Sequence, residues 1–171
     1  MNRAKLVLFM TWLAVPVIVA ADQVSKNWII DRFDMWGESE AICGDFFRLT
    51  RVHNSGAAFG IARGYPHVFL YLTSIAIAAL FLHKLLTSNR TLLYQAALAC
   101  VLSGAIGNLI DRVRFNYVID FLDFGWGETR WPAFNVADSA ITVGVCLLLA
   151  APYFTKSPAA SAPADTPAEA A

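Results

Sequence analysis

The chain has 171 residues, of which 57% are hydrophobic and 15% are charged, and its 13 basic residues balance 13 acidic ones. A soluble domain of this size rarely combines so few charges with several uncharged runs of about 15 residues or more. The composition therefore excludes an ordinary soluble protein and indicates one integral membrane domain, which we place at residues 1–156. Residues 157–171 are mostly Ala, Pro and Ser, which predicts a disordered tail.

Four long apolar runs follow one another along the chain. Each is close to the ~20 residues that cross a hydrocarbon core of about 30 Å as a helix, although the first, second and fourth are short. Helices that continue into polar sequence at their ends would supply the missing length. We therefore expect four transmembrane helices, with spans at about residues 6–21, 68–86, 91–110 and 139–155.

The first run also resembles a secretory signal peptide, since Arg3 and Lys5 precede it and small residues end it. The residues that follow favour an uncleaved span instead. Large apolar side chains recur there at helical spacing, at Trp28, Ile29, Phe33 and Trp36. This pattern predicts a helix that leaves the membrane with an interfacial belt of aromatic side chains.

The connection between the first two runs predicts a β-hairpin. A Gly44-Asp45 turn separates two β-prone stretches within it. Residues 54–59, which follow the second stretch, are too rich in small side chains for a strand. They predict a tight loop or a short helix packed against a close neighbour.

The connection between the last two runs predicts a further short strand at residues 117–121. Gly125, Gly127 and Pro132 follow as turn and loop signals. The tryptophans of this connection suit a surface that rests at the level of the lipid headgroups.

The distribution of basic residues slightly favours an orientation in which both termini are cytoplasmic. In that orientation the cytoplasmic pieces hold five basic residues, at Arg3, Lys5, Lys84, Arg90 and Lys156. Most basic residues then lie outside, which opposes the positive-inside rule. The rule is weakened here because the outer loops are long, whereas the inner pieces are short and have no acid near a span.

Acidic residues gather at the ends of the apolar runs. Asp22, Asp111 and Asp138 each lie at one end of a run, and in a chain that crosses four times these ends share one membrane face. Asp120 lies in the last connection and can reach that face. Carboxylates are costly to keep at a membrane boundary without a use. The arrangement therefore predicts a catalytic or transport site at one membrane surface.

The other reactive side chains do not form a recognisable site. Cys43 is the one cysteine outside the apolar runs, so the three cysteines indicate no disulfide framework. The three histidines lack metal-ligand spacing, and we expect no metal. Ser25 and Lys26 are adjacent and point apart on a helix, which argues against a Ser-Lys catalytic pair.

Asp120 and Asp138 are candidates for an aspartic acid–base pair. In such a pair the ionised carboxylate takes a proton from water while the protonated one polarises the scissile carbonyl, and the two titrate as a unit. Each acid also has a plainer explanation, since Asp138 can cap the fourth helix and Asp120 can pair with Arg112 or Arg114. The helix start favours charge on Asp138, whereas the apolar strand favours a neutral Asp120, so we expect the resting proton on Asp120.

Five short motifs occur in order along the chain. They are DQVSK at 22–26, NSGAAF at 54–59, GAIGNLIDR at 104–112, VIDF at 118–121 and FNVADS at 134–139. Together they resemble the bacterial lipoprotein signal peptidases, the aspartic signal peptidase II family, over about residues 6–154. Ser55 stands where the family more often has Thr, and both residues carry a hydroxyl.

The resemblance implies a membrane all-α fold with a small β element, in which four transmembrane helices carry an extracytoplasmic β-cradle and loop. It implies an inner-membrane protease that cuts the signal peptide from a prolipoprotein just before the diacylglyceryl-modified cysteine. No metal or organic cofactor is then expected. The expected partners are the precursor's signal peptide and membrane lipid, with no nucleic acid, and we expect a monomer with both termini cytoplasmic.

By match of motif, the catalytic pair falls on Asp120 and Asp138. The surrounding family positions imply binding of the substrate backbone and orientation of the acids, at Asn54, Gly56, Asn108, Arg112 and Asn135. Asp22 and Lys26 match the first motif, and the match implies a helix-end pair that ties the first span to the site.

Two other functional classes remain open from the residues by themselves. A proton-coupled transporter also concentrates acids in a membrane protein, but more often near mid-membrane and in two related halves. A non-enzymatic assembly factor would tolerate the exchange of either aspartate for asparagine.

Overall fold

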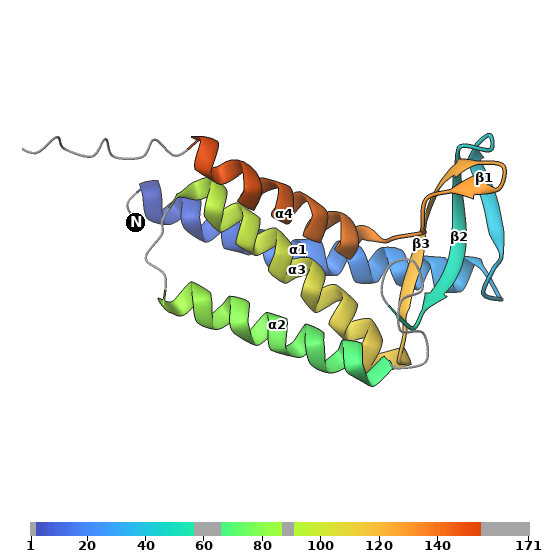
Figure 1. Cartoon of the computed structure of the whole chain (residues 1–171), viewed down its shortest axis with the longest axis horizontal. Helices are drawn as coiled ribbons and strands as arrows, with labels where there is room; N and C mark the ends of the chain where they lie inside the picture. Colours follow the sequence, from blue (N-terminus) through green and yellow to red (C-terminus); the bar gives the residue numbers. More distant parts are fainter. Residues whose placement is uncertain (1–2, 57–65, 87–90, 155–171) are drawn as a thin grey trace, which may run out of the picture.

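The structure is a computed structural model that describes residues 3–56, 66–86 and 91–154. The predicted tail, and residues 57–59 of the predicted tight loop, lie outside the described residues. Four helices lie roughly along the long axis of the molecule, with a small sheet at one end (Figure 1). Each helix is long and apolar enough to cross a membrane, as predicted: α1 (Arg3–Arg32), α2 (Pro66–Leu86), α3 (Leu92–Phe115) and α4 (Val136–Phe154).

Helix α1 continues well beyond the apolar run from which it was predicted. Its 30 residues correspond to about 45 Å, which exceeds the ~30 Å of a hydrocarbon core. The extra turns run through polar sequence and reach the sheet (Figure 1). The predicted aromatic belt is therefore half wrong. Trp28 and Trp36 are exposed, but Ile29 and Phe33 are buried in the core with Ile119 and Phe121 of the sheet. Helix α1 also ends at Arg32, before Phe33 and Trp36.

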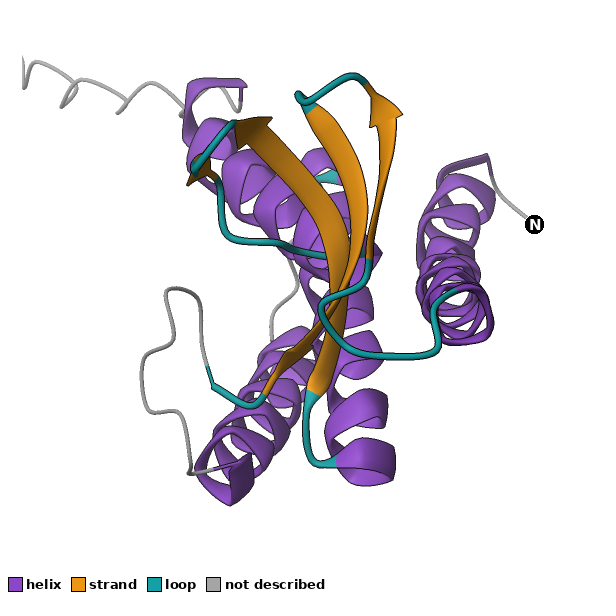
Figure 2. Ribbon diagram, turned by 90° about the vertical axis from the view of Figure 1, so that its right-hand side faces the viewer, coloured by secondary structure: helices purple, strands orange, loops and turns teal. Residues whose placement is uncertain are grey.

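The sheet is antiparallel, and its strands follow one another in the order of the sequence. The predicted hairpin is confirmed, with Gly44 in the turn at a φ of 51°. Figure 2 shows the strands beside the ends of the helices. The four strands are β1 (Ser39–Cys43), β2 (Phe47–Asn54), β3 (Val118–Trp126) and β4 (Thr129–Arg130).

Strand β3 is longer than predicted because Gly125 belongs to the strand instead of the turn. A Cβ on Gly125 would lie 2.5 Å from Arg130 Cα on β4, so the glycine permits a close approach of the two strands. The turn lies at Gly127, where φ is 52°.

Helix α3 is the centre of the bundle and contacts each of the other three helices. Two of its glycines allow this approach. A Cβ on Gly104 would lie 2.2 Å from the carbonyl oxygen of Ala137, and a Cβ on Gly107 would lie 2.5 Å from Asp22 Oδ2. Small residues are the usual way for membrane helices to pack closely. Here they bring α1 and α4 against the same segment of α3.

Candidate active site

Asp120 is the third residue of β3 and is 2% exposed. Its two oxygens accept hydrogen bonds from Asn54 Nδ2 at 2.9 Å and from Asn135 Nδ2 at 2.7 Å. Asn54 is fixed in turn, because its Oδ1 accepts the backbone N–H of Gly56 at 3.1 Å. Asp120 forms no ion pair with Arg112 or Arg114 among the described residues. A buried acid held by amides is therefore the observed arrangement.

Asp138 lies in the first turn of α4 and forms a reciprocal cap with Asn135. The Asp138 N–H donates to Asn135 Oδ1 at 2.9 Å, and Asp138 Oδ2 accepts the N–H of Asn135 at 3.3 Å. This is the geometry of a capping box, with the residue types exchanged for Asn and Asp. Asp138 therefore takes part in the cap of α4, as predicted, but Asn135 is the N-cap residue and Asp138 is the third residue of the helix. The other carboxylate oxygen of Asp138 faces the site.

Asn108 of α3 connects the two acids. Its Nδ2 donates to Asp138 Oδ1 at 2.7 Å, and its Oδ1 accepts from Asn135 Nδ2 at 3.2 Å. Since Asn135 also donates to Asp120, a chain of amides joins one carboxylate to the other. The chain consists of side chains from α3, β3 and the start of α4.

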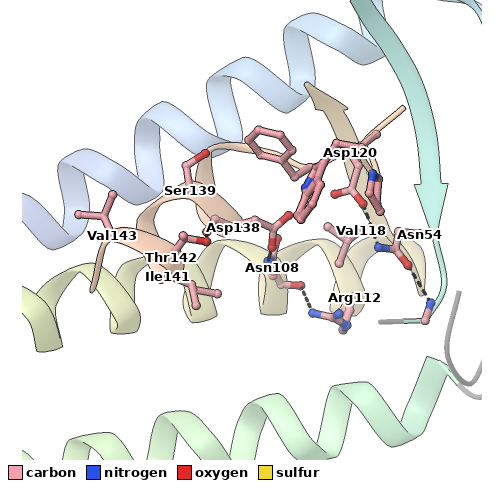
Figure 3. A pocket seen from close by; sticks show the side chains of 15 residues that line it. Asn54, Asn108, Arg112, Val118, Asp120, Asp138, Ser139, Ile141, Thr142 and Val143 are labelled. Atoms are coloured by element: carbon pink, nitrogen blue, oxygen red, sulfur yellow. Dashed lines mark hydrogen bonds between the residues drawn. The ribbon is translucent and has the colours of Figure 1, made fainter. Parts of the chain in front are cut away.

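The two carboxylates face a common cavity of about 590 Å³. Figure 3 shows Asp120 and Asp138 directed toward the same space, with Arg112 and Asn54 at its edge. Part of the cavity wall is apolar, and Ile141 and Val143 of α4 belong to that part. The cavity can therefore hold a ligand with both a polar and an apolar part.

Burial and the neighbouring Asp138 raise the pKa of Asp120 to about 7, and the hydrogen bonds from Asn54 and Asn135 oppose that rise. A carboxyl with this pKa changes its protonation state near neutral pH. A raised pKa at a cavity is typical of a group that takes part in acid–base chemistry. Arg112 stacks over the ring of Phe69, with 5.8 Å to the ring centroid, and presents its charge to the acids of the site.

A second polar layer lies behind the acids and consists of Asp22, Lys26 and Asp111, which we call the ion triad. Lys26 Nζ lies 2.9 Å from a carboxylate oxygen of each acid, and all three side chains are 0–1% exposed. The predicted helix-end pair is wrong in its place, because Asp22 and Lys26 lie well inside α1. Their contact with the site is present, since Lys26 donates to Asn108 Oδ1 at 3.0 Å.

The structure brings together all of the residues predicted for the site. Six of them line the cavity, namely Asn54, Gly56, Asn108, Arg112, Asp120 and Asp138. Asn135 lies between the two acids, and Asp22 with Lys26 lies behind them. Their roles in catalysis remain predictions.

Sequence reasoning placed Asp111 at the membrane face of the site but gave it no role, and it missed Gln23. Gln23 donates to Asp111 Oδ1 at 2.9 Å, and Asp111 itself is fully buried beside Lys26. Helical spacing could have assigned Asp111 to the site, because it lies three residues beyond Asn108 on the same face of α3. For Gln23 the available signal was its place in the motif at 22–26.

Within the described residues, no group of three or more His, Cys, Asp or Glu side chains could hold a metal ion. The three cysteines are free thiols.

The model of the family described as Signal peptidase (SPase) II matches residues 14–154. The chain belongs to the signal peptidase II family. The match includes both acids, the amides between them and the ion triad. Family membership identifies the protein as a protease and argues against the transporter and assembly-factor alternatives.

The chain is also similar to individual curated proteins. It is 44% identical over 144 residues to the lipoprotein signal peptidase of Syntrophotalea carbinolica, covering 82% of this chain and 89% of the relative. It is 47% identical over 133 residues to the lipoprotein signal peptidase of Moorella thermoacetica, covering 77% and 85%.

Solved structures show the same fold. One bacterial membrane enzyme, determined at 2.3 Å resolution, is 34% identical and superposes with a TM-score of 0.75 over 84% of this chain and 87% of its own. A second, determined at 1.9 Å resolution, is 34% identical with a TM-score of 0.73 over 86% and 94%. The predicted fold of four membrane helices with a small β element is therefore confirmed.

Proposed function

We propose that this protein is an intramembrane aspartic endopeptidase that removes the signal peptide from prolipoproteins by cleaving before the diacylglyceryl-modified cysteine. One observation carries the proposal: two buried carboxylates, Asp120 and Asp138, face one cavity and are joined by amides. The signal peptidase II family and its lipoprotein signal peptidases supply the reaction and the substrate class.

In the proposed reaction, Asp138 is the base and Asp120 is the acid. Asp138 takes a proton from a water molecule, whose oxygen attacks the scissile carbonyl carbon. Asp120 holds the resting proton, in keeping with its raised pKa, and donates it toward the carbonyl oxygen. The tetrahedral intermediate collapses as the C–N bond breaks and a carboxyl group passes a proton to the leaving nitrogen.

The amides fix the positions of both carboxylates. Asn108 donates to Asp138, and Asn54 and Asn135 donate to Asp120. Each of these bonds favours the ionised form of its acceptor, so the resting proton on Asp120 depends on its burial and on the neighbouring Asp138. Arg112 at the edge of the cavity is placed to hold carbonyl groups of the substrate backbone.

The apolar wall of the cavity suits the lipid part of the substrate. Ile141 and Val143 lie on α4, a helix with the length and composition of a membrane span. We place the enzyme in the bacterial inner membrane, as a monomer, with the sheet and the catalytic acids at the extracytoplasmic face. The start of α1 and the end of α4 lie at the opposite end of the bundle (Figure 1), which makes both termini cytoplasmic in this orientation.

The test uses the purified full chain and a synthetic precursor peptide, with and without the diacylglyceryl group on its cysteine. We expect cleavage immediately before the modified cysteine, and little or no cleavage of the unmodified peptide. Mass spectrometry of both products identifies the bond that is cut. Equal cleavage of the two peptides, or no cleavage of either, would contradict the proposal.

A further inference from the structure

The ion triad of Asp22, Lys26 and Asp111 has more acid than its own pairing requires. One carboxylate would neutralise Lys26, whereas two leave an excess negative charge in a fully buried place. Removing charges from water is costly unless pairing and hydrogen bonds compensate. The second acid also adds negative charge next to two further carboxylates. Pairing with Lys26 therefore does not account for both acids, and each must have another partner.

Each acid has two further partners, the Gln23 amide and a backbone N–H. Gln23 Nε2 donates to Asp22 Oδ2 at 3.2 Å and to Asp111 Oδ1 at 2.9 Å. Asp22 Oδ1 accepts the N–H of Ala137 at 2.9 Å, and Asp111 Oδ2 accepts the N–H of Ile119 at 3.1 Å. Each of these N–H groups belongs to the residue immediately before a catalytic aspartate in the chain. The two acids thus hold the two backbone segments that carry the catalytic pair.

The local backbone allows both contacts. Helix α3 ends at Phe115, and its C-cap residue Asn116 has a φ of 63° that reverses the chain, so that β3 returns past Asp111 within a few residues. On the other side, Gly107 leaves room for the Asp22 carboxylate between α1 and α3.

Lys26 connects the two arms of the triad, by which we mean Asp22 with its contact to the Ala137 N–H and Asp111 with its contact to the Ile119 N–H. Its ammonium contacts both acids and also donates to Asn108 Oδ1 at 3.0 Å. An ammonium group has donors and no acceptor, so it fixes the orientation of the Asn108 amide. The Asn108 Nδ2 is then directed at Asp138, to which it donates at 2.7 Å.

We propose that the ion triad is a positioning device that fixes the separation and relative orientation of the two catalytic carboxylates. Lys26 clamps Asp22 to Asp111, and each acid holds the backbone next to one member of the pair. Asp22, Lys26 and Asp111 are thus positioning residues that do not touch the substrate. The inference rests on the proposed function, because it needs Asp120 and Asp138 to act together.

The experiment compares Asp111→Leu with Asp111→Asn in the purified full chain, using the diacylglyceryl-modified precursor. Leucine removes the acceptor for the Ile119 N–H at similar volume, whereas asparagine keeps an acceptor oxygen and removes the charge. A misplacement of about 1 Å at a reacting group can lower a rate roughly 100-fold. We expect Asp111→Leu to lower kcat by about that factor with KM little changed, and Asp111→Asn to keep most of kcat.

The pH profile separates positioning from mere stability. The charged side chains that act on the catalytic acids are Asp22 and Lys26 from α1 and Arg112 from α3. If the distance between Asp120 and Asp138 changes, the spacing of the two apparent pKa values of the pair changes with it. We expect an altered spacing in Asp111→Leu and a near-normal spacing in Asp111→Asn.

Asp22→Leu and Asp22→Asn test the other arm through the Ala137 N–H. They leave the pair of Lys26 and Asp111 intact, so they decide the question if Asp111→Leu does not accumulate as folded protein. The matched control is Asp123→Leu, which removes another buried acid of β3 that pairs with Arg130. The control should lose stability while its kcat per folded molecule and its pH profile stay normal.

Two results would overturn the positioning role. One is a folded Asp111→Leu or Asp22→Leu variant with the kcat and pH profile of the wild type. The other is an equal loss in the leucine and asparagine variants, which would show that charge matters and the backbone contact does not. Absence of cleavage by the wild-type protein is a separate result, which contradicts the proposed function itself.

Discussion

Among the described residues, two ion networks pair aspartates with basic side chains, the ion triad inside the bundle and a network on the sheet. The sheet network consists of Asp45, Arg48, Asp123 and Arg130. Arg130 Nε lies 2.7 Å from Asp123 Oδ1, with the side chains 17% and 12% exposed, and Asp45 is 40% exposed. The side chains of the triad are fully buried, whereas those of the sheet network are partly exposed to solvent.

The two networks also bind different backbone groups. In the sheet network, Arg130 donates to the carbonyl oxygens of Asp45 at 3.0 Å and Asp123 at 3.2 Å, which joins β4 to β3 and to the hairpin turn. Asp45 of the same network also accepts the N–H of Gly127. The N–H groups that the triad accepts lie instead beside the catalytic acids. Exposed ion pairs are screened and adjustable, while buried ones keep one geometry. Burial thus makes the same chemistry suitable for positioning instead of strand pairing.

The largest effect is expected at the acids that the triad positions. Asp120→Asn and Asp138→Asn should each lower the cleavage rate by about 10²–10⁴-fold or more, because both halves of the acid–base cycle need a titratable carboxyl. Insertion into the membrane should stay normal. The measurement is cleavage of the diacylglyceryl-modified precursor per folded molecule, with Asp123→Asn of the sheet network as the matched control. Near-normal turnover by either variant removes that residue from the catalytic pair.

The next largest effect is expected on the free energy of unfolding, to which the two networks should contribute unequally. Lys26→Met leaves two buried carboxylates without a cation and should lower the free energy of unfolding by about 3–5 kcal/mol. Arg130→Met should lower it by about 1–2 kcal/mol, since its partners stay partly hydrated. Denaturant unfolding in detergent measures both. Equal losses would mean that burial does not distinguish the networks.

A third comparison uses two glycines in the packing of α3 against α4. A Cβ at Gly104 would press on Ala137 beside the catalytic acid, and a Cβ at Gly144 would lie 2.6 Å from Val101 Cγ2. Each change to alanine should cost about 1–3 kcal/mol by overpacking. We expect Gly104→Ala to lower kcat as well, and Gly144→Ala to leave kcat per folded molecule unchanged. Reduced kcat in both variants would show that the whole interface between α3 and α4 determines the geometry of the site.

The pH dependence of stability should have opposite signs in the two regions. The pKa of Asp120 is raised to about 7 from 3.8, so between these values the folded protein binds more protons than the unfolded chain. Stability from this group is therefore present below pH ~4 and is lost as the pH rises toward 7. The N–H of Gly127, followed by Arg48 and Arg130, lowers the pKa of Asp45, whose contribution is present above pH ~4 and is lost in acid.

Variants separate these two contributions. Unfolding measured from pH 4 to 7 should show a weaker pH dependence in Asp120→Asn than in the wild type. Asp45→Asn should retain the wild-type slope over that range and lose part of the acid sensitivity below it. An unchanged slope in Asp120→Asn would show that its pKa is ordinary.

The smallest effect on activity is expected from labelling the sheet. Cys43 is exposed on β1, and its modification should leave cleavage intact because it lies away from the cavity lining. In the proposed orientation, a membrane-impermeant thiol reagent labels Cys43 in intact spheroplasts. A Thr129→Cys variant on a Cys43→Ser background tests the other end of the sheet. Protection of both positions until lysis would invert the topology.

The sequence by itself determined the features that depend on neighbouring residues. Apolar runs predicted four membrane helices, Gly44-Asp45 predicted the hairpin, and the position of Asp138 at a helix start predicted its cap. These signals are local because helix length, turn geometry and capping involve residues within a few positions of each other. The five motifs indicated the family, and the family in turn indicated the site residues.

The tertiary structure decided how distant residues meet. Burial of Ile29 and Phe33, the inclusion of Gly125 in β3 and the place of Asp22 inside α1 all differ from the expectation, because each depends on what packs against the residue. The joining of both acids of the triad through Lys26 likewise depends on how closely α1 and α3 approach. That approach is set by the absence of a side chain at Gly107, and a periodic pattern along one helix carries no information about the distance to another.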